Sequence, residues 1–334
     1  MDKITHFKNI MERRSDRCGF WHGFPHGESR PRLFEYFGVK DDFELGEKLG
    51  DTFMVLFDGG GEYNHPARGN NAFDIQSGGV PRFSELTDDD IGSLEDYDWP
   101  DAKHVDFSRF AEASRPARES MTPVLSGSWA CFFHTVAGLF GMEDYFMKMH
   151  TDPNLVLEVT ERVVKFYTGM NDKLYAEHGS GFHALFYGND YGTQLDMIIS
   201  PAMFRKFVMP YQKKISDQAK SYGMYSVLHS CGAVSKAIPD MIDAGIDALH
   251  PIQALAAGMD AESLAEKFKD KIVFIGGVDT QVLLREGSAA QIKNEVRRLK
   301  KILGNNFIVS PSHEAVLPDV PPQNIAAMAE AAAE

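Results

Sequence analysis

The chain is poor in cysteine and in positive charge, and it has no long apolar run. Its three cysteines, Cys18, Cys131 and Cys231, are too few and too scattered for a disulfide framework, which favours a reducing cytoplasm. The net charge is −14, which argues against nucleic acid and against anionic membranes as partners. Residues 1–17 lack the apolar region of a signal peptide, and no run of about 18 apolar residues occurs.

Two binding signatures are also missing. No Gly-x-Gly-x-x-Gly opens a helix after the first apolar run, which disfavours a doubly wound dinucleotide-binding sheet. That fold is the second choice after the barrel predicted below. Gly276-Gly277 follows a later apolar run, but no Lys-Ser or Lys-Thr comes after it, so a phosphate-binding loop is not indicated.

Short β-rich runs alternate along the chain with segments whose apolar residues recur at helical spacing. The predicted strands are 17–22, 52–58, 123–128, 183–187, 224–229, 246–250, 272–276 and 307–310. The predicted helices between them include 154–175, 201–222, 234–244, 261–268 and 289–303. Eight such units predict one α/β domain over 1–334, a (β/α)8 TIM barrel, with its site at the carboxyl ends of the strands. The irregular segment 59–120, rich in Gly, Asp and Pro, is predicted to form a lid over the barrel mouth.

His229-Ser230-Cys231 is the strongest chemical signal in the chain. Residues two apart on a strand share a face, and an imidazole and a thiolate together suit zinc. His313 follows another predicted strand and is the candidate third ligand. Three protein ligands with an open fourth position are typical of a catalytic zinc site. The structural alternatives are a buried histidine with a core thiol, and a loop histidine that bonds a backbone carbonyl.

Other side chains near predicted strand ends are candidates for substrate contact. Asp190 lies in a loop flanked by glycines, where it serves either as an acid/base group or as a helix cap. Asp58 ends a predicted strand, and His250 is predicted to be structural. Aromatic residues at this edge either belong to the core or bind a methoxylated ring or a methylammonium group. The remaining candidates for substrate contact are Trp21, His22, Tyr191 and Gln253.

With these residues, the chain resembles the uroporphyrinogen decarboxylase superfamily, most densely over 186–329. The resemblance rests on 188–194 (GNDYGTQ), Ser200-Pro201 with Tyr211, 229–232 (HSCG), 276–281 (GGVDTQ), 310–313 (SPSH) and 321–325 (PPQNI). It implies a TIM barrel and two branches of activity, decarboxylases and zinc-dependent corrinoid-linked methyltransferases. The His-x-Cys pair is similar to the zinc-binding pair of the second branch. Those relatives often carry cysteine where this chain has His313.

The decarboxylase branch is the alternative. Its members carry an early Arg-Gln-Ala-Gly-Arg stretch that holds substrate propionates, and a polyacidic substrate requires such cations. Here the matching segment 18–23 reads CGFWHG and has no arginine. Asp58 falls where decarboxylases keep the aspartate that contacts the pyrrole nitrogens. A non-catalytic metal- or corrinoid-binding accessory protein is a further alternative.

The resemblance therefore implies a zinc-dependent methyltransferase that moves a methyl group between a small molecule and the cobalt of a corrinoid on a partner protein. The small molecule would be a methoxyaromatic compound, a methylamine or a thiol. Zinc would stabilise the departing group, and Asp190 or Tyr187 would protonate the leaving oxygen of an ether. The chain has no Asp-x-His-x-x-Gly segment of its own for carrying a corrinoid, which is consistent with a separate corrinoid protein. Formation of a homodimer is compatible with the sequence.

Overall fold

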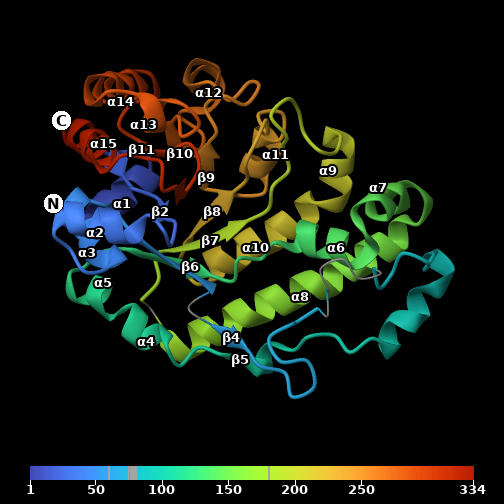
Figure 1. The fold of residues 1–334 in the computed structure, drawn as a ribbon. Helices are drawn as coiled ribbons and strands as arrows, with labels where there is room; N and C mark the ends of the chain where they lie inside the picture. The colour runs from blue at the N-terminus through green and yellow to red at the C-terminus, as the bar shows by residue number, and fades with distance from the viewer. Residues whose placement is uncertain (59–60, 74, 76–80, 180) are drawn as a thin grey trace.

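A curled, eight-stranded parallel sheet forms the centre of the molecule (Figure 1). The computed structural model describes residues 1–58, 61–73, 75, 81–179 and 181–334. The strand order is β1-β11-β10-β9-β8-β7-β6-β3, so neighbouring strands follow one another in the chain around the sheet. The strands are β1 (Gly19–Phe20), β3 (Met54–Phe57), β6 (Val124–Gly127), β7 (Ala184–Gly188), β8 (Tyr225–His229), β9 (Ala248–Ile252), β10 (Val273–Val278) and β11 (Phe307–Pro311). Each predicted strand run overlaps one of them, and the TIM-barrel-like fold class is confirmed.

The first and last strands of the sheet meet at a short contact. The Thr52 N–H donates to the Phe20 carbonyl over 2.8 Å, and the Phe20 N–H donates to the Thr52 hydroxyl over 2.9 Å. Among the described residues, β1 and β3 do not pair as neighbouring strands of the sheet. A side chain at Gly19 would place its Cβ 2.9 Å from both Ile10 and Thr52. The barrel therefore has a seam between β1 and β3.

Helices surround the sheet on its outer side (Figure 1). They are α1 (Lys3–Met11), α2 (Arg30–Phe37), α3 (Asp42–Leu49), α4 (Phe110–Ala113), α5 (Arg115–Glu119), α6 (Phe132–Phe140), α7 (Met142–Thr151), α8 (Pro153–His178), α9 (Pro201–Phe207), α10 (Met209–Ser221), α11 (Ile238–Asp243), α12 (Ala261–Phe268), α13 (Leu283–Glu286), α14 (Ala289–Leu303) and α15 (Pro322–Ala333). The predicted helix 201–222 divides at Val208, because Pro210 has no N–H to donate within a continuous helix. The predictions for 261–268 and 289–303 match α12 and α14, whose N-caps are Asp260 and Ser288.

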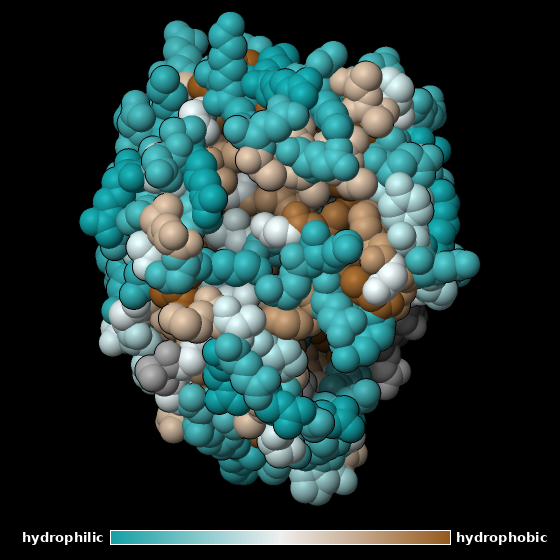
Figure 2. Space-filling view, turned by 90° about the vertical axis from the view of Figure 1, so that its left-hand side faces the viewer, coloured by the Kyte–Doolittle hydropathy of each residue, from teal (hydrophilic) through white to brown (hydrophobic). Residues whose placement is uncertain are grey.

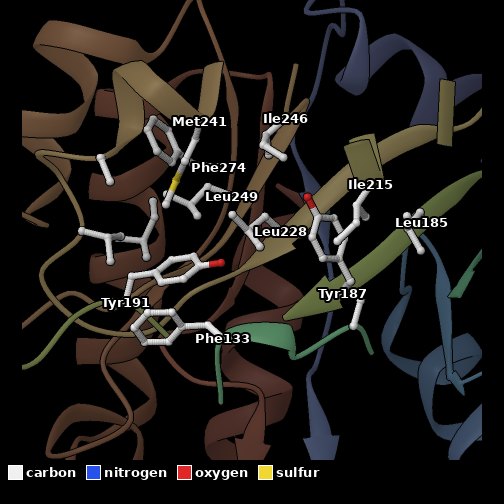
Figure 3. Packing of buried hydrophobic residues seen from close by; sticks show 14 of the residues in the cluster. Phe133, Leu185, Tyr187, Tyr191, Ile215, Leu228, Met241, Ile246, Leu249 and Phe274 are labelled. Atoms are coloured by element: carbon white, nitrogen blue, oxygen red, sulfur yellow. The ribbon is translucent and has the colours of Figure 1, made fainter. Parts of the chain in front are cut away.

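Alternate residues of each strand point into the barrel or out towards the helices. An inner cluster contains Phe186, Val227 and Ile275, while Tyr187 and Leu228 belong to an outer cluster that packs under the helices (Figure 3). Because the side-chain period is two, His229 on β8 and His250 on β9 continue the inner rows of their strands. Their Cα atoms pair in the ladder between β8 and β9.

The described part of segment 59–120 packs against α6 and α8. It contains β4 (Glu62–Tyr63), β5 (Val105–Asp106) and 3-10 helices at Asp88–Asp96 and Ala102–His104. The Phe73 and Phe166 rings lie 5.3 Å apart, and Asp88 accepts the Leu155 N–H at the start of α8 over 2.8 Å. Figure 1 shows β4 and β5 beside α8. Residues 59–60, 74 and 76–80 of the predicted lid lie outside the described residues, and its role as a lid stays a prediction.

The face seen in Figure 2 is mainly hydrophilic, with apolar residues gathered in a central hollow. Among the helices in the described part of the chain, none combines the length and the apolar character that crossing a bilayer requires.

Candidate metal centre

His229 ends β8 with its Nε2 atom facing two other potential metal ligands. That atom lies 3.1 Å from the Cys231 Sγ and 3.3 Å from the Asp190 Oδ1. The same carboxylate oxygen accepts the Cys231 N–H over 2.9 Å. The three ligand atoms lie within 4.8 Å of one another. Nitrogen, sulfur and oxygen donors from two consecutive strand-end loops therefore converge.

The other ring nitrogen of His229 faces a second group. Its Nδ1 atom lies 3.0 Å from the His250 Nδ1 and 3.5 Å from the Glu314 Oε2. His229, His250 and Glu314 also form a potential ligand group. The prediction that His250 is structural missed this contact, and Glu314 was not predicted at all. The register of β8 with β9 could have identified His250, and the position of Glu314 next to His313 could have identified the acid.

His313 lies beside this cluster. Its ring centroid is 6.2 Å from that of His229, and its Nδ1 atom is 3.5 Å from the Glu314 Oε2. A hydrogen bond with the Cys231 side chain raises the pKa of His313, although burial opposes the shift. The Nδ1 atom also accepts the Ala315 N–H over 3.2 Å. All three predicted ligands thus face one region, and the role of His313 as a ligand stays a prediction.

The electrostatics of the cluster suit a cation. Burial alone would lower the pKa of His229, but Asp190, Cys231 and Glu314 outweigh it and raise the pKa to about 10. Burial raises the pKa of Asp190, yet hydrogen bonds from His229 and from the Cys231 N–H bring it below the usual range. An ionised Asp190 accepts protons and does not donate them. Its predicted role as a general acid therefore does not fit this environment, whereas a role as a ligand does.

The donor set fits zinc. In tetrahedral coordination, Zn–N near 2.1 Å and Zn–S near 2.3 Å place nitrogen and sulfur about 3.6 Å apart. The 3.1 Å between His229 and Cys231 needs to lengthen by only about half an ångström. The Glu314 Oε2 and the His250 Nε2 are buried and have no hydrogen-bond partner among the described residues, although the Glu314 Oε2 lies 3.5 Å from the Nδ1 atoms of both His229 and His313.

Two glycines hold the ligand-bearing loops against each other. A Cβ atom at Gly232, where φ is +85°, would lie 2.5 Å from the backbone carbon of Gly192. Next to this contact the Ala233 N–H donates to the Thr193 carbonyl over 2.7 Å. The loop after β7, which carries Asp190, is thereby fixed against the loop after β8.

A cavity of about 390 Å³ opens beside His313, a volume that suits a small molecule. Gln253, a predicted substrate contact, lines it and accepts the Gly232 N–H over 2.7 Å. Arg285 also lines it but is paired with Asp319 at 2.6 Å. The other lining residues are Thr280, Gln281, Ser312, His313, Ala315 and Leu317.

Tyr187 and Tyr191 do not reach this site. Both are fully buried in the outer cluster, and both hydroxyls bond to Gln212 on α10 (Figure 3). The ladder pairs Gly188 with His229, so Tyr187 points to the opposite face of the sheet from the histidine. Their predicted roles as proton donor and substrate contact do not fit this placement. Strand alternation could have indicated it, because Phe186 and Tyr187 cannot both point inwards.

Three further predicted residues, Trp21, Asp58 and His22, belong to neither potential ligand group. Trp21 packs in the inner cluster, with its ring 5.2 Å from that of His250. Asp58 accepts the Trp129 N–H over 2.7 Å, and burial raises the pKa of that carboxyl. The Trp129 ring in turn lies 5.3 Å from that of His229. His22 is paired with Asp51, away from the cluster.

A TIM-barrel-like α/β protein with a His-x-Cys pair at one strand end is the class that fold and site define. The sequence pattern of the uroporphyrinogen decarboxylase (URO-D) family matches residues 69–334, and the chain belongs to this family. The resemblance noted from the sequence is thereby confirmed.

Comparison with curated proteins finds methyltransferases. The chain is 26% identical over 210 residues to a methylated-thiol–coenzyme M methyltransferase of Methanosarcina mazei, covering 61% of this chain and 53% of that protein. It is 26% identical over 102 residues to a methylcobamide:CoM methyltransferase of Methanosarcina acetivorans, covering 30% of this chain and 29% of that protein. The chain thus spans about half the length, or less, of these relatives.

Among solved structures, a methyltransferase from Methanosarcina mazei superimposes with a TM-score of 0.68. The match covers 100% of this chain and 98% of that one, at 16% identity. At this identity the likeness supports the fold.

Proposed function

We propose that the protein is a zinc-dependent methyltransferase that moves a methyl group between a small methylated compound and the cobalt of a corrinoid on a partner protein. The observation that carries the proposal is the contact of the His229 Nε2 with the Cys231 Sγ at the strand ends, beside a cavity of about 390 Å³. The methylated-thiol and methylcobamide relatives support this reaction class, and they favour a thiol over a methoxyaromatic or an amine.

His229 and Cys231 would hold the zinc, with Asp190 or His313 completing the protein ligands. Zinc in such a site supplies Lewis acidity to the sulfur, oxygen or nitrogen that gains or loses the methyl group. The chain's own contribution is orientation. The His229 Nδ1–H can donate a hydrogen bond to His250 or to Glu314. In this tautomer the Nε2 atom has a free lone pair with which to bind the metal.

The decarboxylase alternative receives no support from the charges at the site. A polyacidic tetrapyrrole needs unpaired cations, but the arginine of the cavity, Arg285, is already bound to Asp319. Asp190 and Glu314 add negative charge next to His229. These groups favour a metal cation over a carboxylate-rich substrate.

The direct test is to count zinc in the purified protein and to follow cobalt absorbance. The reaction would contain methylcobalamin with an alkyl thiol, and then a corrinoid protein in place of free methylcobalamin. We expect one zinc per chain and demethylation of the cobalt that depends on the thiol. Metal-free protein that decarboxylates uroporphyrinogen would overturn the proposal. Zinc-loaded protein that catalyses no methyl transfer would favour an accessory role.

Replacing His250 tests the orientation of His229. We expect His250→Phe, which removes the nearer of the two acceptors next to the His229 Nδ1, to weaken zinc binding about 10- to 100-fold. His250→Asn keeps an acceptor oxygen and should lose less. Competition with a zinc chelator measures both affinities. Equal affinity in wild type and both variants would remove this role from His250.

Exposed apolar side chains on the loops after the strands support docking of a partner at the barrel mouth. They are Leu195 (83% exposed), Leu255 (56%), Val282 (53%) and Leu317 (46%), which follow β7, β9, β10 and β12 (Ala315–Val316). Exposed apolar surface that gathers on one face often marks an interaction site. We therefore propose this rim as the surface that meets the corrinoid protein.

A matched pair of substitutions tests the rim. Leu255→Asp should raise the KM for the corrinoid protein about tenfold, because it places a charge within an apolar contact, while turnover of free methylcobalamin stays unchanged. Met121→Asp is the control, since Met121 is 55% exposed but precedes β6, at the opposite end of the strands. Equal KM values for the two variants would place the docking surface elsewhere.

A further inference from the structure

A second cavity, of about 360 Å³, lies at the seam between β1 and β3, under α2 and α3. We call it the seam pocket and define it by the side chains of Trp21, His22, Phe24, Phe43, Phe53 and Phe57. It shares no lining residue with the cavity beside His313. Its position follows from the short contact between the two strands, since beyond Phe20 and Thr52 the sheet edges leave space that aromatic side chains line.

A layer of aromatic rings separates the seam pocket from the metal centre. The Phe57 ring lies 4.9 Å from that of Trp129, which packs on His229. The Trp21 ring lies against His250 on the same side. None of the potential metal ligands lines the seam pocket. It is therefore a separate site.

His22 and Asp51 form a buried pair in the wall of this pocket. The His22 Nδ1 lies 2.6 Å from the Asp51 Oδ2, and the His22 N–H donates to the other carboxylate oxygen over 3.0 Å. The two residues are only 4% and 5% exposed. The Nδ1 atom is therefore the donor to this carboxylate, and in that tautomer the Nε2 atom is an acceptor. That Nε2 is buried and has no hydrogen-bond partner among the described residues.

The charged side chains of the pocket other than the His22–Asp51 pair have partners of opposite charge. Arg30 donates to both carboxylate oxygens of Asp42, over 3.0 and 2.9 Å. Glu47 accepts the Thr122 hydroxyl over 3.0 Å and pairs with Lys3 at 2.5 Å. The lining thus offers an incoming molecule mainly apolar and aromatic surface, together with the acceptor on His22.

We propose that the seam pocket binds a small phenol, whose ring packs among the aromatic side chains and whose hydroxyl donates a hydrogen bond to the His22 Nε2. A carboxylate fits less well, because the arginine of the lining, Arg30, already pairs with Asp42, and burial would remove the strong hydration of the carboxylate. A hydrocarbon would fill the same space but leave the buried nitrogen without a partner, which costs binding free energy. Aromatic rings pack favourably edge to face against a phenolic ring. The proposal does not depend on zinc or on methyl transfer.

Calorimetric titration with para-cresol and with toluene, two probes of similar shape, tests the proposal. Wild-type protein should bind para-cresol about tenfold more tightly than toluene, the value of one hydrogen bond to a buried acceptor. In His22→Phe this preference should disappear. His26→Phe, an exposed histidine four positions further on, is the control and should keep the preference.

Two further variants make the test decisive. Phe43→Trp should reduce the binding of both probes by narrowing the pocket while leaving His22 intact, which covers the case in which His22→Phe fails to fold. Cys231→Ala should bind para-cresol like wild type, because the metal centre is not involved. No preference for para-cresol in wild type, or a preference that survives in His22→Phe, would overturn the proposal. Loss of binding in Cys231→Ala would assign the phenol to the metal centre and would equally overturn it.

Discussion

Replacing Cys231 with alanine is expected to remove zinc from the protein and to abolish methyl transfer. The Cys231 Sγ is the one sulfur donor in contact with the His229 Nε2, and thiolate ligation contributes much of the affinity of a zinc site. Replacing a residue that only hydrogen-bonds a metal ligand already costs about 10- to 100-fold in metal affinity, so loss of the ligand itself should cost more than about 100-fold. Metal analysis after dialysis against a chelator measures the loss, and cobalt absorbance measures the reaction.

Cys131→Ala is the matched control for this prediction. Cys131 is also partly buried and free, but its Sγ lies 3.6 Å from the Tyr167 hydroxyl and 3.8 Å from the Thr135 hydroxyl, not beside His229. It should retain zinc and full turnover. If Cys231→Ala instead kept stoichiometric zinc and wild-type rates, the metal centre would have to be sought at His229, His250 and Glu314.

Replacing Gly232 with alanine should damage both the metal centre and the stability of the protein. The left-handed conformation at Gly232, with φ of +85°, costs an alanine about 1–2 kcal/mol. The new Cβ would also lie 2.5 Å from the Gly192 backbone, and such overpacking adds about 1–3 kcal/mol. Because the loop after β8 must move to relieve this contact, Cys231 would shift away from Asp190. Denaturant unfolding and zinc analysis on the same sample measure the two effects.

Gly223→Ala separates the two costs. Gly223 has a similar φ of +72°, but a Cβ there would meet nothing within 4 Å. It should lose only the conformational part, about 1–2 kcal/mol, and keep its zinc. Equal destabilisation of the two variants, with zinc retained in both, would show that the contact between the two loops is unimportant for the centre.

Strand positions and the main metal-binding pair could be predicted because both depend on local patterns. The eight apolar runs became the eight strands of the barrel, and His229 and Cys231, two residues apart, do meet. The side of the sheet to which each strand residue points was harder to predict. Tyr187 looked like a site residue because it ends a strand, yet it is the neighbour of the inward-facing Phe186 and so points outwards. On a strand, moving by one residue decides whether a side chain points towards the site or into the core under the helices.

His250 and Glu314 lie at or near predicted strand ends in the sequence, but the sequence did not show that they contact His229. His250 and Glu314 meet the His229 Nδ1 only because β9 pairs with β8 and because the loop after β11 reaches back across the barrel mouth. The protonation state of Asp190 could not be predicted from the sequence either, since the pKa of this carboxyl depends on hydrogen bonds from His229 and from the Cys231 N–H. Burial and neighbouring charge set a pKa, and both arise only on folding.

Three features can be derived from the order of amino acids alone: the barrel class, the acidic character of the chain and the side chains available to hold a metal. These follow from the periodicity of apolar residues, the net charge and the chemistry of neighbouring ligands. Only the tertiary structure decided which nitrogen of His229 faces Cys231, which acids surround it, and that β1 and β3 leave a pocket beside His22. The reason is that the ring of parallel strands brings together groups that are far apart in the chain, such as His229 and Glu314.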